Sequence, residues 1–442
     1  MVGGAPAVSI RARVAGRLLA CVVRGGRRVP AAAAAATWLC VAAVLLAGCG
    51  SAGQARPGAG RSAVTSGAWR ADTSGTRQRL YAVACLSALR CEAVGAAGTI
   101  VSTGDGGVTW RAQASPLRGS PAILYRIACV APSSCYVIAR PDTILVTHDG
   151  GVTWSSHVLA LAGVGAGLTK QACPPGPVGG PSAQPCRLGL LDIACVSASI
   201  CYAVATGPAG YFYGPISEPG WFPAGPPNAI WMTRDGGMSW ARQPHPPGVG
   251  CEAGDCGDLL YHYPLEWISC LGSGLCRAGG GYFGGCGNCG FVYAVIASAR
   301  PGTPWTMLTC AQPPAPCNKA LAAMHPSPRG GAFSPDAGAC PTSARCYGVS
   351  LFAGNGVAWS ADGGELWLEG PSGASSVRNA IACPAARTCY TAGDGGTITR
   401  TVNGTAWVAD GRPATRDLYG LTCVDAVTCY AVGDGGTIVA RR

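Results

Sequence analysis

One sequence repeat recurs seven times along the chain and largely determines which folds the chain can adopt. Its clearest copy has an apolar run ending at Cys85, five residues, a second apolar run beginning at Cys91, a glycine turn and a third run to Thr103. The Cys-x5-Cys spacing links Cys85 with Cys91, Cys129 with Cys135, Cys195 with Cys201, Cys270 with Cys276, Cys340 with Cys346, Cys383 with Cys389 and Cys423 with Cys429. Uninterrupted pairs lie 44, 43 and 40 residues apart. Four short strand-like runs per unit of about 40 residues are typical of a β-propeller.

The two ends of the repeat region complement each other. Residues 68–72 match the end of a repeat, whereas the last repeat stops after its third strand, near Ala440. We expect the strand at Trp69 to complete the last blade and close the ring, because closure removes exposed sheet edges. The prediction is an all-β, seven-bladed propeller of four-stranded antiparallel blades over residues 67–442, with one Cys-x5-Cys disulfide per blade.

The leader predicts export. Residues 1–48 have the layout of a signal peptide, because Arg24, Arg27 and Arg28 precede an apolar stretch at 29–48. Residues 46–49 read Leu-Ala-Gly-Cys and resemble the bacterial lipoprotein lipobox. That resemblance implies lipidation of Cys49 and a protein anchored to the outer side of the bacterial cell membrane. An uncleaved transmembrane anchor is the alternative. Residues 49–66 are small, polar and glycine-rich, as in a flexible tether.

The net charge of +11 exaggerates how basic the folded part is. Six arginines lie before residue 29, and without them the charge falls to +5. Only two lysines occur, Lys170 and Lys319, and no basic stripe alternates with aromatic residues. We therefore expect no nucleic-acid partner.

Cysteine usage also favours an oxidising compartment. Of 25 cysteines, Cys21, Cys40 and Cys49 lie in the leader and fourteen form the repeat pairs. The Cys-x2-Cys spacing at 286–289 also occurs in redox and zinc sites, but no helical context or histidine cluster accompanies it. We predict no metal and no cofactor. The other eight cysteines fall into close pairs that we expect to be disulfides: Cys173 with Cys186, Cys251 with Cys256, Cys286 with Cys289, and Cys310 with Cys317.

A second motif, Ser/Thr-x-Asp-Gly-Gly-x-Thr/Ser-Trp, follows the third strand of several repeats. It occurs at Thr103–Trp110, Thr147–Trp154, Thr233–Trp240 and Ser360–Trp367, with weaker copies at Ser298–Trp305 and Thr401–Trp407. This motif resembles the Asp-box, or BNR repeat, of sialidase-type propellers. Together with Gly-Asp-Gly-Gly-Thr-Ile at 393–398 and 433–438, it resembles more closely the photosystem II stability/assembly factor family of WD40/YVTN/BNR-like repeats. The resemblance covers residues 68–442 and implies a propeller with a scaffold or assembly role.

The Asp-box residues are predicted to be structural. An aspartate before Gly-Gly accepts hydrogen bonds from the amides of its own turn, and the glycines permit positive φ. The following tryptophan should pack against the neighbouring blade. A catalytic role is disfavoured because an active site needs one carboxylate pair, not an equivalent aspartate in each blade. The residues are Asp105, Asp149, Asp235, Asp362, Trp110, Trp154, Trp240 and Trp367.

Five insertions point to the binding face. In an up-and-down blade of strands a to d, the a–b and c–d turns lie on one face, and the b–c turns and d–a connections on the other. Insertions at about 155–190, 208–228, 243–264, 279–291 and 309–338 all fall on the second face. They hold the extra cysteine pairs and a group of aromatic residues: Tyr211, Phe212, Tyr213, Trp221, Phe222, Tyr261, Tyr263, Tyr282 and Phe283. Disulfide-fixed aromatic loops are typical of recognition surfaces, although the rings could instead pack the loops onto the disc.

The sialidase resemblance does not extend to catalysis. No arginine triad or Tyr–Glu nucleophile pair can be transferred to this sequence, and we assign no catalytic residue. Glu218, Glu252, Asp255, Asp258 and Glu266 lie on or near the insertion face, but no spacing selects a glycosidase pair among them. We expect a monomeric, non-catalytic lipoprotein that binds a protein or a cell-envelope glycan. The alternative is a sialidase-like or other glycoside hydrolase, or a lectin, acting on extracellular glycans.

Overall fold

The computed structural model describes residues 11–14, 17–20, 67–130, 133–159, 189–206, 229–244, 265–282, 292–298, 300–307, 337–349, 356–364 and 367–442. The chain forms two compact units, Met1–Val64 and Thr65–Arg442. In the first unit, β1 (Arg11–Val14) pairs antiparallel with β2 (Arg17–Ala20). No helix within the described ranges is long and apolar enough to cross a membrane.

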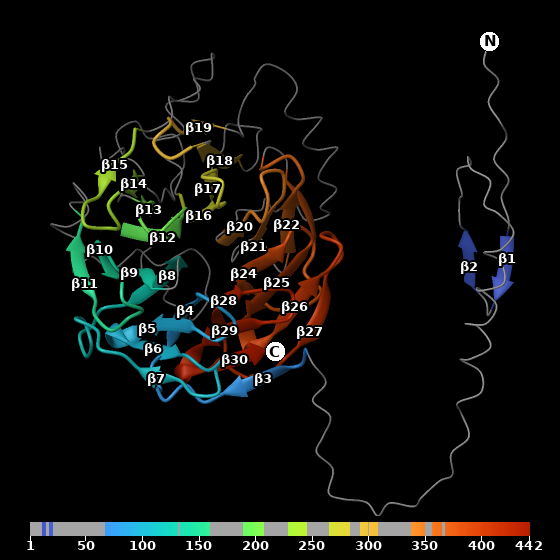
Figure 1. The fold of residues 1–442 in the computed structure, drawn as a ribbon, viewed down its shortest axis with the longest axis horizontal. Coiled ribbons are helices and arrows are strands. Elements are labelled where there is room, and N and C mark those ends of the chain that lie inside the picture. Colours follow the sequence, from blue (N-terminus) through green and yellow to red (C-terminus); the bar gives the residue numbers. More distant parts are fainter. Residues whose placement is uncertain are drawn as a thin grey trace, which may run out of the picture. The chain divides into compact units, whose positions relative to one another are not determined.

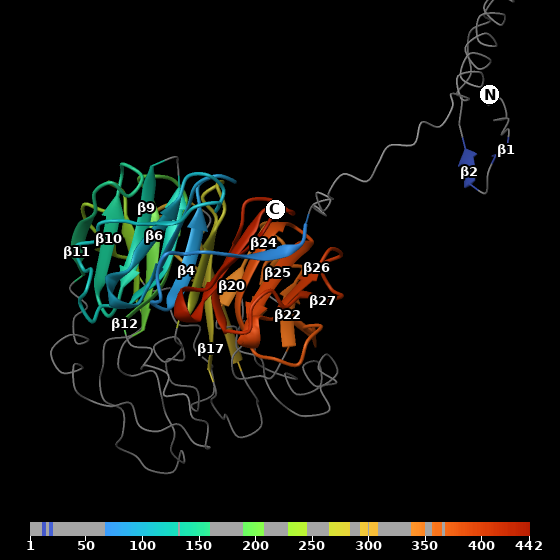
Figure 2. The same cartoon turned by 90° about the horizontal axis from the view of Figure 1, so that it is seen from below.

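The second unit holds seven four-stranded antiparallel sheets arranged in a ring (Figure 1). From the inner strand outward, the first four sheets are β4 (Leu80–Cys85), β5 (Cys91–Gly95), β6 (Ile100–Thr103), β7 (Arg111–Ala112); β8 (Leu124–Val130), β9 (Ser134–Ala139), β10 (Thr143–Thr147), β11 (Ser155–Val158); β12 (Gly189–Cys195), β13 (Cys201–Thr206), β14 (Ala229–Thr233), β15 (Ala241–Arg242); and β16 (Trp267–Cys270), β17 (Cys276–Tyr282), β18 (Val292–Ser298), β19 (Thr306–Met307). The other three are β20 (Ala337–Ala339), β21 (Cys346–Val349), β22 (Gly356–Ser360), β23 (Leu368–Pro371); β24 (Arg378–Ala385), β25 (Thr388–Gly393), β26 (Ile398–Thr401), β27 (Val408–Gly411); and β28 (Leu418–Cys423), β29 (Cys429–Gly433), β30 (Ile438–Arg441), β3 (Trp69–Asp72). This is the predicted propeller architecture. Figure 2 shows the strands running along the axis of the ring.

The ring is closed by its N-terminal strand. β3 pairs antiparallel with β30, with Trp69 opposite Arg441 and Asp72 opposite Ile438. The amide of Gly67 continues this pairing by donating to the Arg442 carbonyl at 3.0 Å. The last sheet therefore gains its fourth strand from the opposite end of the sequence, as predicted.

A disulfide joins strands a and b in every sheet of the ring. All seven Cys-x5-Cys pairs are bonded, at Cα–Cα distances between 3.9 Å and 4.1 Å. In most of these sheets the two cysteines are also register partners, as Cys85 is with Cys91 and Cys129 with Cys135. Each disulfide closes a short loop, and closing a loop of this length stabilises the fold by about 2 kcal/mol on the chain-entropy estimate.

Adjacent sheets are joined by the residue after the second cysteine. In five sheets this residue is a buried tyrosine. In most of these its ring packs edge-on against a tryptophan of a neighbouring sheet, as Tyr430 does on Trp110 and Tyr347 on Trp407. Its hydroxyl can donate to a carbonyl in the a–b turn of the next sheet, for example from Tyr390 to Ala426 at 2.6 Å.

Two sheets depart from this arrangement. Arg277 takes the tyrosine position in the fourth sheet, and its Nη2 donates at 2.7 Å to the carbonyl of Ser343, in the a–b turn of the next sheet. In the first sheet the residue is Glu92, which is buried. The position after the second cysteine therefore accepts arginine, another long side chain that donates a hydrogen bond to the next sheet. Glu92 instead places a carboxyl group between two sheets.

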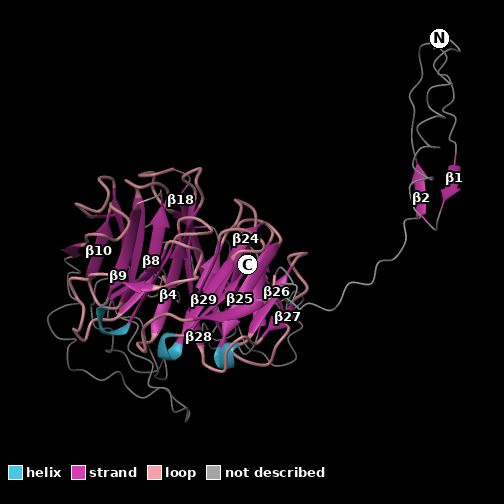
Figure 3. Cartoon of the chain, turned by 60° about the horizontal axis from the view of Figure 1, so that its bottom comes forward, coloured by secondary structure: helices cyan, strands magenta, loops and turns pink. Residues whose placement is uncertain are grey.

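The two faces of the ring carry different turns. The b–c turns contain three short 3-10 helices, η2 (Ala96–Gly98), η4 (Asp394–Gly396) and η5 (Asp434–Gly436), which lie on one side of the ring (Figure 3). Their second residue has φ between 54° and 63°, which is why two of the three have glycine there. The described residues that flank the predicted insertions, such as Leu159, Gly189 and Ala229, are at the same strand ends. We call this side the insertion face and the opposite side the Asp-box face.

Candidate binding site on the inner strands

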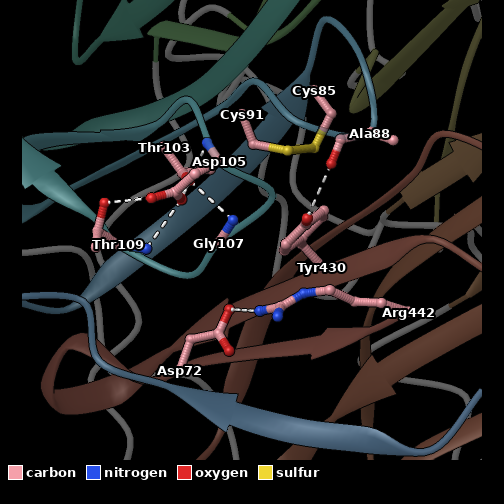
Figure 4. Close-up of polar contacts among 10 residues, drawn as sticks. All are labelled: Asp72, Cys85, Ala88, Cys91, Thr103, Asp105, Gly107, Thr109, Tyr430 and Arg442. Atoms are coloured by element: carbon pink, nitrogen blue, oxygen red, sulfur yellow. Dashed lines mark hydrogen bonds and ion pairs between the residues drawn. A yellow bond between two sulfur atoms is a disulfide. The ribbon is translucent and has the colours of Figure 1, made fainter.

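The Asp-box aspartates are held by their own turns (Figure 4). Asp105 Oδ1 accepts from the Thr109 amide at 2.9 Å and from the Thr103 hydroxyl at 2.8 Å, while Oδ2 accepts from the Thr109 hydroxyl at 2.6 Å. These bonds lower the pKa of Asp105 to about 2, the Thr109 hydroxyl contributing most. Asp149 and Asp235 make the same three bonds, and Asp362 accepts from Ser360. A carboxylate committed in this way is a turn element and a poor proton donor.

The cysteines outside the repeat pairs lie outside the described residues. The structure therefore tests neither the lipidation of Cys49 nor the disulfides expected in the insertions, and both stay predictions. The eight insertion cysteines concerned are Cys173 and Cys186, Cys251 and Cys256, Cys286 and Cys289, and Cys310 and Cys317. The part of the cysteine prediction that the structure confirms is the set of seven repeat disulfides.

Most of the predicted aromatic and acidic site residues also lie outside the described residues. These are Tyr211, Phe212, Tyr213, Trp221, Phe222, Tyr261, Tyr263, Phe283, Glu218, Glu252, Asp255 and Asp258. Tyr282 ends β17, with its side chain outside the description. Glu266 is described and buried beside the inner strand β16. The aromatic and glycosidase assignments therefore stay predictions.

A repeated irregularity of the inner strands marks a different set of residues. The a–b pairing shifts by one residue at the same place in five sheets, four positions before the first cysteine. The extra residues are Tyr81, Tyr125, Leu191, Asn379 and Tyr419. A β-bulge leaves its extra residue out of the ladder and re-aims the side chain. Each bulge adjoins the b–c end of its sheet, because Leu80, for instance, pairs with Gly95 beside η2.

Three of these bulge residues are tyrosines on consecutive inner strands, and they form one cluster. The ring centroid of Tyr81 is 6.0 Å from that of Tyr125 and 5.9 Å from that of Tyr419. The guanidinium of Arg79 lies 5.1 Å from the Tyr419 ring centroid. Arg126 and Arg140 lie 4.2 Å and 3.7 Å from the centroid of Tyr125. These six residues are called the inner-strand cluster below.

Carboxylates border the cluster at both ends. Asp434, in η5, pairs with Arg79 and accepts from the Tyr419 hydroxyl at 3.2 Å. Burial raises the pKa of Tyr419, and the negative charge of Asp434 raises it further. At the other end, Arg126 Nε is 3.6 Å from Asp192, whose Oδ2 accepts the Ile268 amide at 2.9 Å. Burial raises the pKa of Asp192, while Arg126 and the amides of Ile268 and Ile193 oppose the rise.

The cluster combines flat aromatic area with cations that remain accessible. The tyrosines and Arg126 are half-buried, and the side chain of Arg79 is 45% exposed despite its partner. Guanidinium groups over aromatic rings are suited to bind carboxylates and polar backbone while the rings cover apolar side chains. No group of three or more histidine, cysteine, aspartate or glutamate side chains within the described ranges could hold a metal ion. The arrangement is suited to recognition.

Sequence reasoning missed this cluster although a signal for it was present. Leu-Tyr stands directly before the alternating part of strand a at 80–81, 124–125 and 418–419, always at the same distance from the cysteine. Aligning the repeats on that cysteine would have shown three tyrosines in register. The bulge that frees them from the ladder is a backbone feature that the residue pattern does not show.

The comparisons place the chain near one group of propellers. A family model for the photosynthesis system II assembly factor YCF48 matches residues 61–169. Among solved structures, YCF48 bound to D1 peptide is 15% identical with a TM-score of 0.52, covering 84% of this chain and 96% of that one. YCF48 from Cyanidioschyzon merolae is 16% identical with a TM-score of 0.53, covering 85% and 98%. No curated protein matches the chain.

The structural likeness extends beyond that group. The WD40 repeats of RRP9 reach a TM-score of 0.52 at 9% identity, covering 85% of this chain and 98% of that one. At such identities the likeness shows the fold and leaves the function to the site. The chain is therefore an all-β propeller of four-stranded antiparallel blades with BNR-type repeats, similar over its first blades to the YCF48 family model.

Proposed function

We propose that this chain is an exported, lipid-anchored scaffold that binds a segment of a protein partner on its insertion face, at the inner-strand cluster. The observation that carries the proposal is the alignment of Tyr81, Tyr125 and Tyr419 at one bulge position, each with a guanidinium over its ring. Three adjacent inner strands thereby present the same residue type beside the same turns. Packing of the ring does not require this, since Leu191 and Asn379 occupy the same bulge elsewhere.

The chemistry of the cluster selects the kind of partner. Arg79, Arg126 and Arg140 lie over the rings of the cluster, so a ligand carboxylate can bind a guanidinium while its neighbours contact the rings. The tyrosine rings suit apolar or aromatic side chains next to it. We infer an extended peptide segment that carries an acidic group, either a side chain or a C-terminus. The structure of YCF48 bound to D1 peptide supports a peptide ligand for this type of propeller.

The test is a binding screen with the purified, oxidised full chain. Arrays of acidic, neutral and basic peptides would be probed in parallel with a glycan panel, with released sugars recorded as well. We expect retention on acidic peptides, and its loss in a Tyr81→Ala, Arg79→Gln double variant. The matched control is Arg387→Gln, an exposed arginine in an a–b turn on the Asp-box face.

The alternatives give different results in the same screen. Retention on glycans without release would identify a lectin. Release of sugar that depends on Glu266 would identify a glycoside hydrolase. Retention on peptides that is unaffected by the double variant would contradict the assignment to the inner-strand cluster.

A further inference from the structure

We propose, resting on the lipid anchor of the proposed function, that the Asp-box face lies against the lipid bilayer, with its apolar turn tips in the interface. The feature behind this is a set of large apolar side chains exposed at the ends of a–b and c–d turns. They are Leu89, Val108, Val152, Met238, Val402 and Val427, called the apolar tips below. Val108, Val152 and Met238 are 75%, 73% and 69% exposed.

The tips are arranged along part of the ring. Val108, Val152 and Met238 share the variable position of the Asp-box, after Gly-Gly, in the first three sheets. Leu89 lies in the first sheet as well, and Val402 and Val427 extend the arc through the last two sheets. Five consecutive sheets are thus represented. Single exposed apolar residues are ordinary, but these belong to equivalent turns and therefore face the same way.

Nothing in the turn itself requires an apolar residue at the shared position. The Asp-box is held by Thr103, Asp105, the Gly107 amide and Thr109, and the side chain of Val108 takes no part in these bonds. A polar residue there would leave the turn intact. The hydrogen bonds of the turn therefore do not explain why valine or methionine occupies this exposed position.

The path of the chain brings this face to the membrane. Gly67 and Trp69 pair with Arg442 and Arg441, at the end of β30 where the other sheets carry their c–d turns. The N-terminal segment therefore enters the ring on the Asp-box face, in the last sheet, within the arc of apolar tips. Seventeen residues lie between Cys49 and Gly67, and a chain of this length spans at most about 65 Å. A lipid on Cys49 would hold the face close to the bilayer, where even weak contacts are well populated.

The charges of the same turns select the apolar contact over an electrostatic one. Within the described part of the chain these turns carry five arginines, Arg90, Arg234, Arg300, Arg345 and Arg387, and five acids, Asp105, Asp149, Asp235, Asp362 and Asp425. With these charges balanced, anionic headgroups gain little net attraction. We therefore infer docking that depends on the apolar tips and is insensitive to salt and to anionic lipid. The insertion face would then point away from the membrane.

The experiment measures hydrogen exchange of the full chain in phosphatidylcholine vesicles. A protease site placed within residues 50–66 allows the propeller to be released into solution as the reference. We expect slower exchange in vesicles at 104–109, 148–153 and 234–239, lost on release. Exchange at 96–98, 394–396 and 434–436, on the opposite face, should not change. The pattern should persist at about 0.5 M salt and with anionic lipid added, salt being a strong screen at that concentration.

A variant and a matched control separate docking from simple proximity. The triple variant Val108→Asn, Val152→Asn, Met238→Asn should lose the protection while keeping its fold. Val158→Asn changes a side chain that is also 69% exposed but ends β11 on the insertion face, and it should keep the protection. Flotation of the full chain with the vesicles, lost on protease release, tests the anchor by itself. Equal exchange in vesicles and in solution while the chain floats with the vesicles would overturn the proposal. So would protection confined to the insertion face, protection abolished by salt, or protection in solution that rises with protein concentration and indicates self-association.

Discussion

Asp410 contacts three side chains around the strand that closes the ring. Its Oδ2 accepts from Trp69 Nε1 at 2.8 Å and from Arg441 Nη1 at 2.9 Å, and its Oδ1 pairs with Arg400. The Asp410 side chain is 8% exposed and that of Arg441 15%. Asp410 therefore connects the closing strand β3 and its neighbour β30 to the preceding sheet. Substitution by alanine leaves two cations and an indole N–H without this acceptor.

The cost of Asp410→Ala follows from those burials. Removing one partner of a buried ion pair costs about 3–5 kcal/mol. Arg400 is 35% exposed and can recover water, so we take the lower end, about 3 kcal/mol. Asp410→Asn keeps an acceptor for Trp69 and should cost about half as much. The control is Gln113→Ala, which removes the acceptor of Trp154 Nε1, at 3.4 Å, together with a hydrogen bond to Glu92, from a joint that does not close the ring.

Urea unfolding under oxidising conditions and hydrogen exchange at 67–72 would measure this effect. Asp410→Ala should lower the free energy of unfolding and accelerate exchange in the closing strand, while Gln113→Ala costs about 1 kcal/mol or less. A loss below about 1 kcal/mol for Asp410→Ala, with unchanged exchange at 67–72, would refute the reasoning.

Three further predictions concern a buried carboxyl group, a close-packed glycine and one of the repeat disulfides. Burial raises the pKa of Glu92 to about 7, although the charge of Arg90 and a hydrogen bond with Gln113 act to lower it. The stabilising contribution of the protonated carboxyl group is therefore full below pH 4.5 and is lost as the pH rises through 7. Glu92→Gln should therefore raise stability by about 3 kcal/mol at about pH 8 and by little at about pH 4, and equal thermal shifts at both would contradict this. A Cβ on Gly433 would stand 1.9 Å from the Asp417 carbonyl oxygen, whereas one on Gly104 meets nothing within 4 Å. Gly433→Ala should thus cost about 3 kcal/mol and Gly104→Ala less than about 1 in chemical denaturation. Replacing Cys383 and Cys389 by serine should cost about 2 kcal/mol, and a loss that persists equally under reducing conditions would show that packing, not the cross-link, is responsible.

The sequence was sufficient for the architecture because the repeat is local. Two cysteines separated by five residues, with apolar alternation on both sides, specify a hairpin, and the recurrence of that hairpin specifies the ring. The complementary fragments at Trp69 and Ala440 predicted the closure that the pairing of β3 with β30 confirms. The Asp-box hydrogen bonds followed from turn chemistry that depends on a few adjacent residues.

The candidate site was harder to predict because it depends on contacts between sheets. Tyr81 and Tyr419 are far apart in the sequence and meet only when the ring closes. Asp192 and Arg126 come from different sheets, and their proximity depends on the angle between those sheets. Attention to the insertions drew the prediction toward residues such as Trp221, which lie outside the described residues. The burial of Glu92 between two sheets was also missed. It becomes apparent only when Glu92 is compared with the buried tyrosines at the equivalent position of the other sheets.

The bulge on five of the inner strands gives this architecture room to diverge. Its residue belongs to no ladder pair, so tyrosine, leucine and asparagine are all found there without a change in the flanking register. Under the proposed function, substitutions at these positions would alter recognition one blade at a time, while the cysteines and the interlocking tyrosines stay fixed. Paralogues with the same scaffold should differ most at the positions equivalent to Tyr81, Leu191 and Asn379, and duplication of such a gene would supply new specificities without new folds.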